Sequence, residues 1–380
     1  MPKKKKKKVR RFYDYSLLFT IVFLTIFGLV MIYSSSSYMA QINYKGNAGY
    51  FMTRQAMIAL GGFFVMIIIS RMDYHWYAGL ASLAIMVSWG LMIAVTLFGR
   101  EVNGKKRWIE LGPASFQPTE LVKITVIVAL AVLITRLGKN IDRMAGVVRV
   151  GLIAGPLAAI VAANNLSSGI IIVGIAFVMM FVASQKKMPY FLCVLAAAVV
   201  LIFAGPIGHV LTALKILKPY QLSRINVWLD PEAYPTTGGY QVLQGLYAIG
   251  SGGLFGKGLG ESIQKLGFVP ESQNDMIFAI ICEELGLFGA MMVIFLFVFM
   301  IYRFMLIASN APDLFGALLV VGVMAHIAIQ VILNIAVVTN TIPNTGITLP
   351  FISYGGTSVL FLMIEMGMVL SVSNQIRLEK

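Results

Sequence analysis

Long apolar runs divide the sequence and constrain its fold more than any other feature. Ten of them approach or reach the roughly 17 to 25 residues that cross a bilayer. Only 12% of the residues are charged, against about a quarter in soluble domains. The runs lie at 15–33, 52–70, 76–98, 119–136, 147–164, 167–184, 189–207, 276–303, 314–338 and 355–374. Because backbone groups in lipid must be satisfied within the segment, we predict an all-α polytopic membrane protein with about ten transmembrane helices.

Basic residues in the short connections predict the orientation. A lysine run at 3–8, with Arg10 and Arg11, precedes the first apolar run. The even-numbered connections carry Arg71, Arg136, Lys139, Arg143, Lys186, Lys187 and Arg303. By the positive-inside rule both termini are cytoplasmic, with an N-terminal segment 1–14, a membrane domain 15–376 and a C-terminus 377–380. The net charge of +14 then reflects topology, and no nucleic-acid partner is expected.

Three connections fall on the outer face by this count, at 99–118, 208–274 and 339–354. The first holds Arg100, Lys105, Lys106 and Arg107, followed by Trp108, on the side where topology disfavours positive charge. Two readings remain open for this cluster: a plain surface loop, or an anion site suited to a phosphate-bearing lipid head.

The second connection makes a large extracellular loop between the seventh and eighth helices. Its segment 240–250 has the pattern of a short amphipathic helix lying on the bilayer. Its GGLFGKG run lacks the spacing and the Ser or Thr of a phosphate-binding loop. In the third connection, prolines and glycines between 340 and 358 forbid a continuous helix in an apolar stretch. We expect that segment to wall a cleft.

Four of the sixteen acidic residues lie at or inside the apolar run after 268: Glu271, Asp275, Glu283 and Glu284. Ser272 and Asp275 match a capping box for the eighth helix. Glu283 lies about 12 Å deeper along that helix, where a carboxylate is costly unless it is partnered or hydrated. Glu283 and Glu284 are open to three readings: protonation, pairing with a buried base such as Lys123, or contact with water at the inner face.

Neither the cysteines nor the histidines have metal-ligand spacing. Cys193 and Cys282 lie in separate apolar runs, and we read them as core residues. His326, Gln330 and Asn334 recur every four residues and form one polar stripe. That stripe is either interhelical hydrogen-bonding glue or a cleft lining.

Three motifs resemble one family: NGKKRWIELGPASFQPTELVK at 103–123, FVPESQNDMIFAIICEELG at 268–286 and NIAVVTNTIPNTGITLPFISYGGTS at 334–358. They resemble the SEDS proteins (shape, elongation, division and sporulation), the group of FtsW and RodA, and the resemblance covers essentially the whole chain. The last motif looks more like FtsW or its sporulation relatives than RodA.

The resemblance implies a peptidoglycan glycosyltransferase that polymerises lipid II on the outer face of the bacterial cytoplasmic membrane, here in septal cell division. The family's essential aspartate falls on Asp275, although this chain has Asn274-Asp275-Met276 where the family commonly has Thr-Asp-Phe. The residues implied to bind substrate are Arg107, Trp108, Glu120, Lys123, Ser353 and Tyr354. Gln117 and Pro118 complete the family motif.

In the implied mechanism, Asp275 is the general base and undecaprenyl pyrophosphate is the leaving group. Arg107 and Lys123 stabilise the leaving charge, and a divalent cation, Mg²⁺ or Mn²⁺, is an alternative source of that charge. Glu120 and Lys123, at i and i+3, face each other and could simply pair.

The implied partners are a class B penicillin-binding protein, a transpeptidase, and other divisome or elongasome membrane proteins. Apolar faces at 288–299 and 315–323 are candidate contacts for the transpeptidase or plain lipid-facing helix. The alternatives to septal synthesis are a RodA-type elongation polymerase, a sporulation polymerase and a lipid II flippase or transporter.

Overall fold

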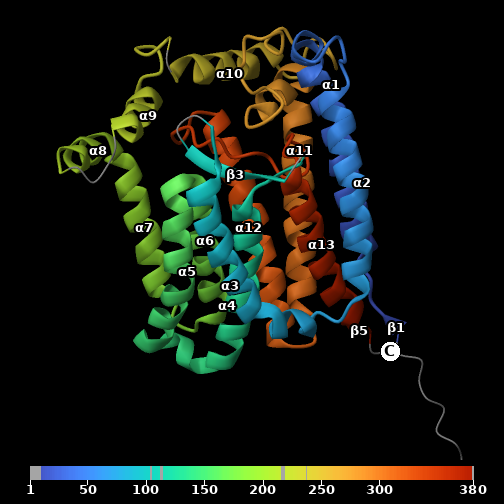
Figure 1. Ribbon diagram of the computed structural model, residues 1–380, viewed down its shortest axis with the longest axis vertical. Coiled ribbons are helices and arrows are strands. Elements are labelled where there is room, and N and C mark those ends of the chain that lie inside the picture. Colours follow the sequence, from blue (N-terminus) through green and yellow to red (C-terminus); the bar gives the residue numbers. More distant parts are fainter. Residues whose placement is uncertain (1–9, 103–104, 112–113, 215–218, 237, 379–380) are drawn as a thin grey trace, which may run out of the picture.

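Long helices packed side by side make up most of the molecule (Figure 1). The computed structural model describes residues 10–102, 105–111, 114–214, 219–236 and 238–378. Within that part of the chain, nine helices are long and apolar enough to cross a membrane, and the count is ten if one bent helix pair is taken as a single span. The nine are α1 (Tyr15–Asn43), α2 (Tyr50–Arg71), α3 (His75–Phe98), α4 (Pro118–Leu137, continued by η1, Gly138–Asp142), α5 (Met144–Asn164), α6 (Leu166–Ala183), α11 (Ile277–Ser309), α12 (Leu314–Val338) and α13 (Thr357–Gln375). The predicted all-α membrane architecture is confirmed.

The seventh span, predicted as one run at 189–207, is broken. Helix α7 (Met188–Ile202) and helix α8 (Ala204–Ala213) meet at an angle of 79°. Gly205 and Pro206 open α8, and a proline there cannot donate the backbone bond that would continue α7. Most side chains of α7 are exposed, as expected of a helix facing lipid.

Both chain ends meet at one end of the bundle, called here the terminal end. Strand β1 (Arg10–Arg11) pairs antiparallel with β5 (Arg377–Leu378). Next to them the buried Asp14 caps α1 by accepting from the Leu17 amide, and it forms an ion pair of 2.8 Å with Arg303 of α11. The lysine run at 3–8 and residues 379–380 lie outside the described residues.

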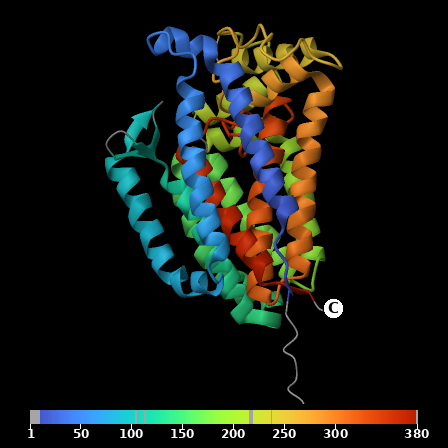
Figure 2. The same ribbon diagram turned by 90° about the vertical axis from the view of Figure 1, so that its right-hand side faces the viewer.

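The opposite end, called here the loop end, carries the three long connections. Residues 99–118, expected as a loop, form a small antiparallel sheet of β2 (Arg100–Val102), β3 (Lys105–Leu111) and β4 (Ala114–Phe116). Figure 2 shows this sheet above α3, at the edge of the bundle. The second connection contains α9 (Pro219–Leu229) and α10 (Gly239–Gly252), so the predicted helix at 240–250 is confirmed. Helix α10 runs across the top of the bundle in Figure 1.

Two local predictions were wrong. Helix α11 has no side-chain cap, because the Ser272 hydroxyl instead donates to the Ser35 carbonyl of α1, and the capping box does not form. The face at 315–323 is not free for a partner or lipid. Helix α12 packs against α4, α6 and α11, and its residues from Phe315 to Val323 are buried except the half-buried Ala317.

Gly28 of α1 lets the third connection approach the bundle closely. A Cβ on Gly28 would lie 2.5 Å from the Phe351 carbonyl oxygen and 2.7 Å from the Ile352 Cα. Phe351 itself has a positive φ of 63°, so this backbone has little freedom to retreat. The glycine therefore fixes how the segment after α12 folds back over the helices.

We expect Gly28→Ala to destabilise the protein by about 1–3 kcal/mol, because the added methyl overpacks against backbone. The matched control is Gly61→Ala on α2, where a Cβ meets nothing within 4 Å. Alanine favours helix, so that variant should be neutral or slightly stabilising. Thermal unfolding in detergent measures both, and equal midpoints for the two variants would contradict the packing argument.

Candidate active site

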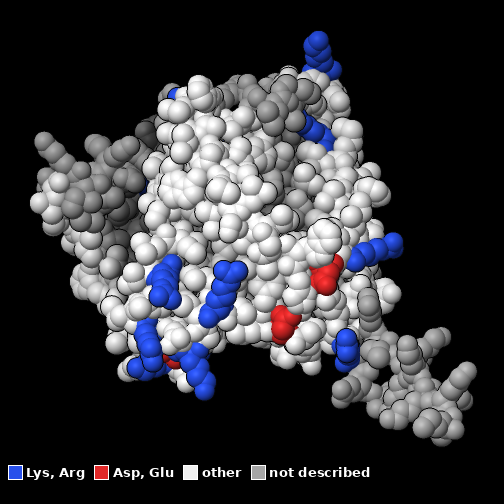
Figure 3. Space-filling model, turned by 60° about the horizontal axis from the view of Figure 1, so that its bottom comes forward, with Lys and Arg blue, Asp and Glu red and all other residues white. Residues whose placement is uncertain are grey.

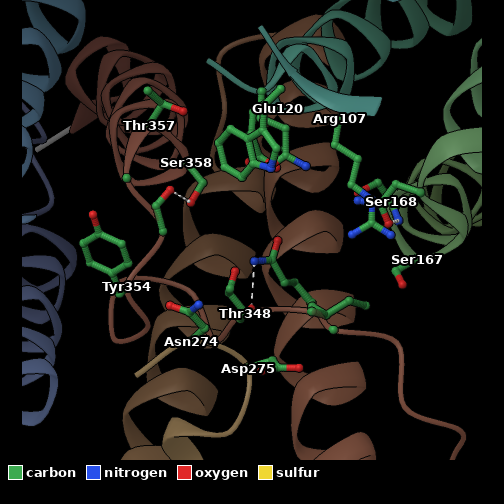
Figure 4. Close-up of a pocket in the computed structure, with 18 of the residues that line it drawn as sticks. Arg107, Glu120, Ser167, Ser168, Asn274, Asp275, Thr348, Tyr354, Thr357 and Ser358 are labelled. Atoms are coloured by element: carbon green, nitrogen blue, oxygen red, sulfur yellow. Dashed lines mark hydrogen bonds between the residues drawn. The ribbon is translucent and has the colours of Figure 1, made fainter. Parts of the chain in front are cut away.

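A cavity of about 520 Å³ lies near the loop end, between helices that are distant in sequence. Its walls come from α2, β3, α4, the α5–α6 junction, the residues before α11, α12 and the segment before α13. In Figure 4, Tyr354 and Thr357 lie on one side of it, Arg107 and Ser168 on the other, and Asp275 and Thr348 between. The broken segment at 340–358 thus walls a cleft, as predicted.

Asp275 lies in the turn that precedes α11 and faces this cavity. Its side chain is 8% exposed, and its Oδ1 has no hydrogen-bond partner among the described residues. Burial, and then the nearby negative charge of Glu271, raises the pKa of Asp275 to about 7. A carboxyl with that pKa is poised to take a proton near neutral pH.

Asp275 stands apart from the other buried acids of the described chain. Asp14, Glu120, Glu283, Glu284 and Glu365 each have a basic side chain within 4 Å. No such ion pair to Asp275 is found within the described residues. Buried charges are normally paired because desolvation is costly, so this unpaired carboxyl makes Asp275 the leading candidate for a functional residue.

The backbone around Asp275 is nevertheless held firmly. Asn334 of α12 donates from Nδ2 to the Asp275 carbonyl at 2.9 Å and to the Ile347 carbonyl at 2.7 Å. One turn earlier on the same helix, Gln330 donates to the Thr348 carbonyl at 3.0 Å and contacts His326, which pairs with Glu365. The predicted polar stripe is therefore interhelical glue, and Gln330 also lines the cavity.

Glu120 and Lys123 form a buried ion pair of 2.9 Å on the first turns of α4. The predicted pairing is confirmed. Both residues also line the cavity, and their contact with substrate stays a prediction. Lys123 is not the partner of Glu283 or Glu284, which was one of the readings open at the sequence level. Lysines from the loop before α11 pair with those two acids instead.

Arg107 and Trp108 reach the cavity from strand β3. The Arg107 Nε donates to the Asn164 carbonyl at 3.1 Å, which anchors the strand on the end of α5. Lys106, the neighbouring residue, turns away and donates to the Leu97 carbonyl of α3. The side chains of Arg100 and Lys105 lie outside the described part of the structure.

Of the two residues predicted to bind substrate in the last motif, only Tyr354 lines the cavity. The Tyr354 amide donates to the Gln273 carbonyl at 2.8 Å, close in sequence to Asp275. Ser353 does not line the cavity: the side chain is buried, and its hydroxyl accepts from the Leu349 amide at 2.7 Å. Ser353 shapes the turn that presents Tyr354.

Sequence reasoning missed several cavity residues. Arg54 of α2 brings a second guanidinium, and its Nη1 donates to the Tyr50 hydroxyl at 3.2 Å. An arginine near the start of an apolar run was the available signal. The other missed lining residues are mostly small and polar: Asn165, Ser167, Ser168, Asn274, Thr357 and Ser358.

Few oxygen atoms near Asp275 are available as ligands for a divalent cation. Within the described residues, no group of three or more His, Cys, Asp or Glu side chains has metal-binding geometry. The Oδ1 atoms of Asn274 and Asp275 are both buried and without partners there, and Glu271 is beside them. These hard oxygens suit Mg²⁺ or Mn²⁺ only if a ligand such as pyrophosphate completes the coordination.

Comparison with known proteins assigns the family. The family model FtsW/RodA/SpoVE, described as "Cell cycle protein", matches residues 15–378. The chain is 38% identical over 366 residues to "Stage V sporulation protein E" of Bacillus subtilis, covering 95% of this chain and 96% of the relative. It is 38% identical over 371 residues to "Probable peptidoglycan glycosyltransferase FtsW" of the same organism, covering 97% and 92%.

Solved structures share the fold over nearly the whole length. One, described as "Structural coordination of polymerization and crosslinking by a peptidoglycan synthase complex", has a TM-score of 0.78 at 27% identity and covers 96% of this chain and 98% of that one. The rod shape determining protein RodA of Thermus thermophilus has a TM-score of 0.69 at 24% identity, covering 96% and 97%. The chain is a multi-pass membrane protein that belongs to the FtsW/RodA/SpoVE family.

Proposed function

We propose that the chain is a peptidoglycan glycosyltransferase that polymerises lipid II. The observation that carries this proposal is the unpaired, buried Asp275 facing a cavity whose walls bear Arg54, Arg107 and Lys123. An acid poised near neutral pH beside fixed positive charge suits attack by a hydroxyl on a sugar that carries a pyrophosphate leaving group. Relatives named as FtsW peptidoglycan glycosyltransferases support the same chemistry.

In the proposed reaction, the C4 hydroxyl of one disaccharide attacks the anomeric carbon of another. The new C–O bond forms as the bond to the pyrophosphate oxygen breaks, and Asp275 takes the hydroxyl proton. The leaving group is already acidic, so no second carboxyl has to protonate it, unlike in glycosidases. Arg107 and Lys123 stabilise the charge that builds on the pyrophosphate.

A divalent cation remains a second proposal for that charge. Glu271 and the Asn274 amide oxygen would hold Mg²⁺ or Mn²⁺ beside the pyrophosphate, where the cation would neutralise the leaving oxygens.

For the orientation, we propose that the terminal end is cytoplasmic and that the cavity opens toward the outer leaflet. Figure 3 looks onto the terminal end, where lysines and arginines gather around the helix connections. The short connections at the terminal end, or the helix turns beside them, carry Arg71, Arg136, Lys139, Arg143 and Lys186. An excess of basic residues in short loops marks the cytoplasmic side.

The physiological role we propose is septal synthesis during cell division. The equal identity to an FtsW and to a sporulation protein favours a sporulation polymerase as the second candidate. Depletion separates the two: filamentous growth supports division, whereas normal vegetative division with failed spores supports sporulation.

Asp275→Asn should abolish glycan formation from purified lipid II, because the amide matches the carboxyl in shape but cannot accept the proton. The assay is gel separation of labelled polymer made by the purified protein. A variant that polymerises at the parental rate would remove Asp275 as the base. Polymer-free but rapid movement of lipid II across vesicles by the parent would favour a flippase instead.

The same variant should keep or raise thermal stability at pH 8. The pKa of Asp275 is about 7 in the folded protein and near 3.8 unfolded, so its contribution to stability is fully present below about pH 4 and is lost as the pH rises through 7. The gain from Asn should therefore shrink as the pH falls from about 8 toward about 4. A lower melting temperature for the variant at pH 8 would contradict the burial cost.

Arg107→Ala should raise the KM for lipid II about tenfold, the effect of losing a charge-assisted hydrogen bond. Lys106→Ala is the matched control, since that neighbouring base does not line the cavity. For Lys123, the double variant Glu120→Gln, Lys123→Met avoids leaving a buried unpaired charge. Unchanged KM and unchanged binding of an undecaprenyl pyrophosphate analogue in both variants would assign these charges to structure alone.

We further propose that a class B penicillin-binding protein packs against α11. The support is the likeness to a peptidoglycan synthase complex and a row of exposed apolar side chains on that helix: Phe288, Met291, Met292, Phe295 and Val298. Such a partner would also contact the connection that contains α9 and α10. A face of this kind is otherwise covered by lipid.

A photoreactive thiol probe on Phe295→Cys should crosslink to the co-expressed transpeptidase. The native Cys193, exposed on α7 across the bundle, supplies the control, with Cys193→Ser in the test variant. Crosslinking from position 295 but not from 193 supports the interface. Equal yields from both positions, or none from either, would assign the α11 face to lipid.

A further inference from the structure

Helix α11 is interrupted nine residues after it begins, and a neighbouring loop fills the gap. Gly286 has φ 67° and ψ −168°, outside helical geometry. In an unbroken helix the amides of Leu287 and Phe288 would donate to the carbonyls of Glu283 and Glu284. Here they donate to Gly253 and Leu254, at 2.9 and 3.1 Å.

The carbonyls released by the break are used by the same loop. The Lys257 amide donates to the Glu283 carbonyl and the Gly258 amide to the Glu284 carbonyl, both at 2.9 Å. A Cβ on Gly286 would lie 2.3 Å from the Gly256 nitrogen, and a Cβ on Gly256 would lie 2.1 Å from the Glu284 carbonyl oxygen. The backbone of loop 253–258 therefore bridges the break in α11. The close approach at Gly256 and Gly286 fixes which loop residues face which helix residues.

The side chain of Glu283 adds further contacts between α11 and the loop that follows α10. It is fully buried and pairs with Lys257 Nζ at 2.7 Å. It also accepts from the Ser262 hydroxyl and from the amides of Ile263 and Gln264. One carboxylate thus gathers the loop after α10 onto the first turns of α11.

The side chain of Glu284 ties the same point to a third element. It accepts from the Ser34 hydroxyl of α1 at 2.6 Å and pairs with Lys265 Nζ at 2.9 Å. Lys265 also donates to the Gly260 carbonyl at 2.6 Å. We call Glu283, Glu284, Lys257 and Lys265 the clamp.

The clamp lies at the end of helix 277–285 that is farther from Asp275, and its residues are not part of the cavity wall. Asp275, by contrast, lines the cavity and lies two residues before this short helix. Because Gly286 interrupts the helical hydrogen bonding, the short helix is joined to the rest of α11 through loop 253–258 and not by a continuous helix. The clamp holds its far end, and Asn334 holds its near end at the Asp275 carbonyl.

We propose that the clamp residues are positioning residues that fix the tilt of helix 277–285 and so hold the Asp275 carboxylate in the cavity. The proposal rests on the proposed function. Its physical basis is that buried ion pairs stabilise a fold little more than apolar residues of the same size would, while they demand one geometry. The four charged groups around the helix break therefore serve to position helix 277–285 more than to stabilise the fold.

The test replaces one pair by neutral groups of similar size, Glu283→Gln with Lys257→Met, which leaves no unpaired buried charge. We expect folding to be retained, with kcat for lipid II polymerisation reduced on the order of 10- to 100-fold because the base is misplaced, and KM changed less than about twofold.

The matched control is Asp14→Asn with Arg303→Met, which removes the buried ion pair at the other end of α11. Asparagine keeps the N-cap of α1. This variant should keep the parental kcat per folded molecule and the parental KM. A clamp variant that behaves like this control, or whose loss of kcat merely follows its folded fraction, would overturn the proposal.

A second measurement needs no glycosyl transfer. In a Cys193→Ser, Cys282→Ala background, Asp275→Cys reports the placement of the turn through its rate of alkylation by a water-soluble maleimide. The clamp substitutions should accelerate alkylation severalfold, whereas the control pair should not. Equal alkylation rates for the clamp and the control substitutions would overturn the positioning role. This outcome is separate from the proposed function, which would be overturned if the parent protein made no glycan.

Discussion

The cost of burying charge in an apolar bundle governs the arrangement of this protein. Within the described chain, the buried acids other than Asp275 are each held by a basic side chain, across α1 and α11, within α4, between α12 and α13, and between α11 and the loop after α10. These ion pairs compensate buried charges that the hydrocarbon of the lipid could not solvate. Asp275 departs from this rule, and its carboxyl faces a cavity lined by the basic side chains of Arg54, Arg107 and Lys123. The chemistry that we propose for the site depends on this departure.

Breaks in regular structure create that cavity. The α5–α6 junction presents Ser167 and Ser168, the turn before α11 presents Asp275, and the irregular segment after α12 presents Thr348 and Tyr354. Irregular backbone at such depth is tolerated only where protein or a cavity satisfies it. Side-chain amides provide that satisfaction here: Asn334 and Gln330 bond the carbonyls of Asp275, Ile347 and Thr348. The rigid helices α4, α12 and α13 thus support a site built from non-helical pieces.

The sequence was sufficient for features that depend on local pattern. Apolar length predicted the spans, i,i+3 spacing anticipated the Glu120–Lys123 pair, and the family motif pointed to Asp275. Features set by tertiary contact could not be predicted. Ser272 binds α1 rather than capping α11, and residues 257 and 265 reach the two glutamates only because their loop crosses the helix break. Arg54 joins the cavity only through the packing of α2 against α13.

The most direct test of the account is the pH dependence of lipid II polymerisation by the purified protein. With burial raising the pKa of Asp275 to about 7, the base is half deprotonated near neutrality. We predict that kcat/KM rises about tenfold per pH unit below that value and levels off above it. A rate that is flat between about pH 5 and 8, or that falls over this range, would show that Asp275 does not accept the proton, and the central claim would be wrong.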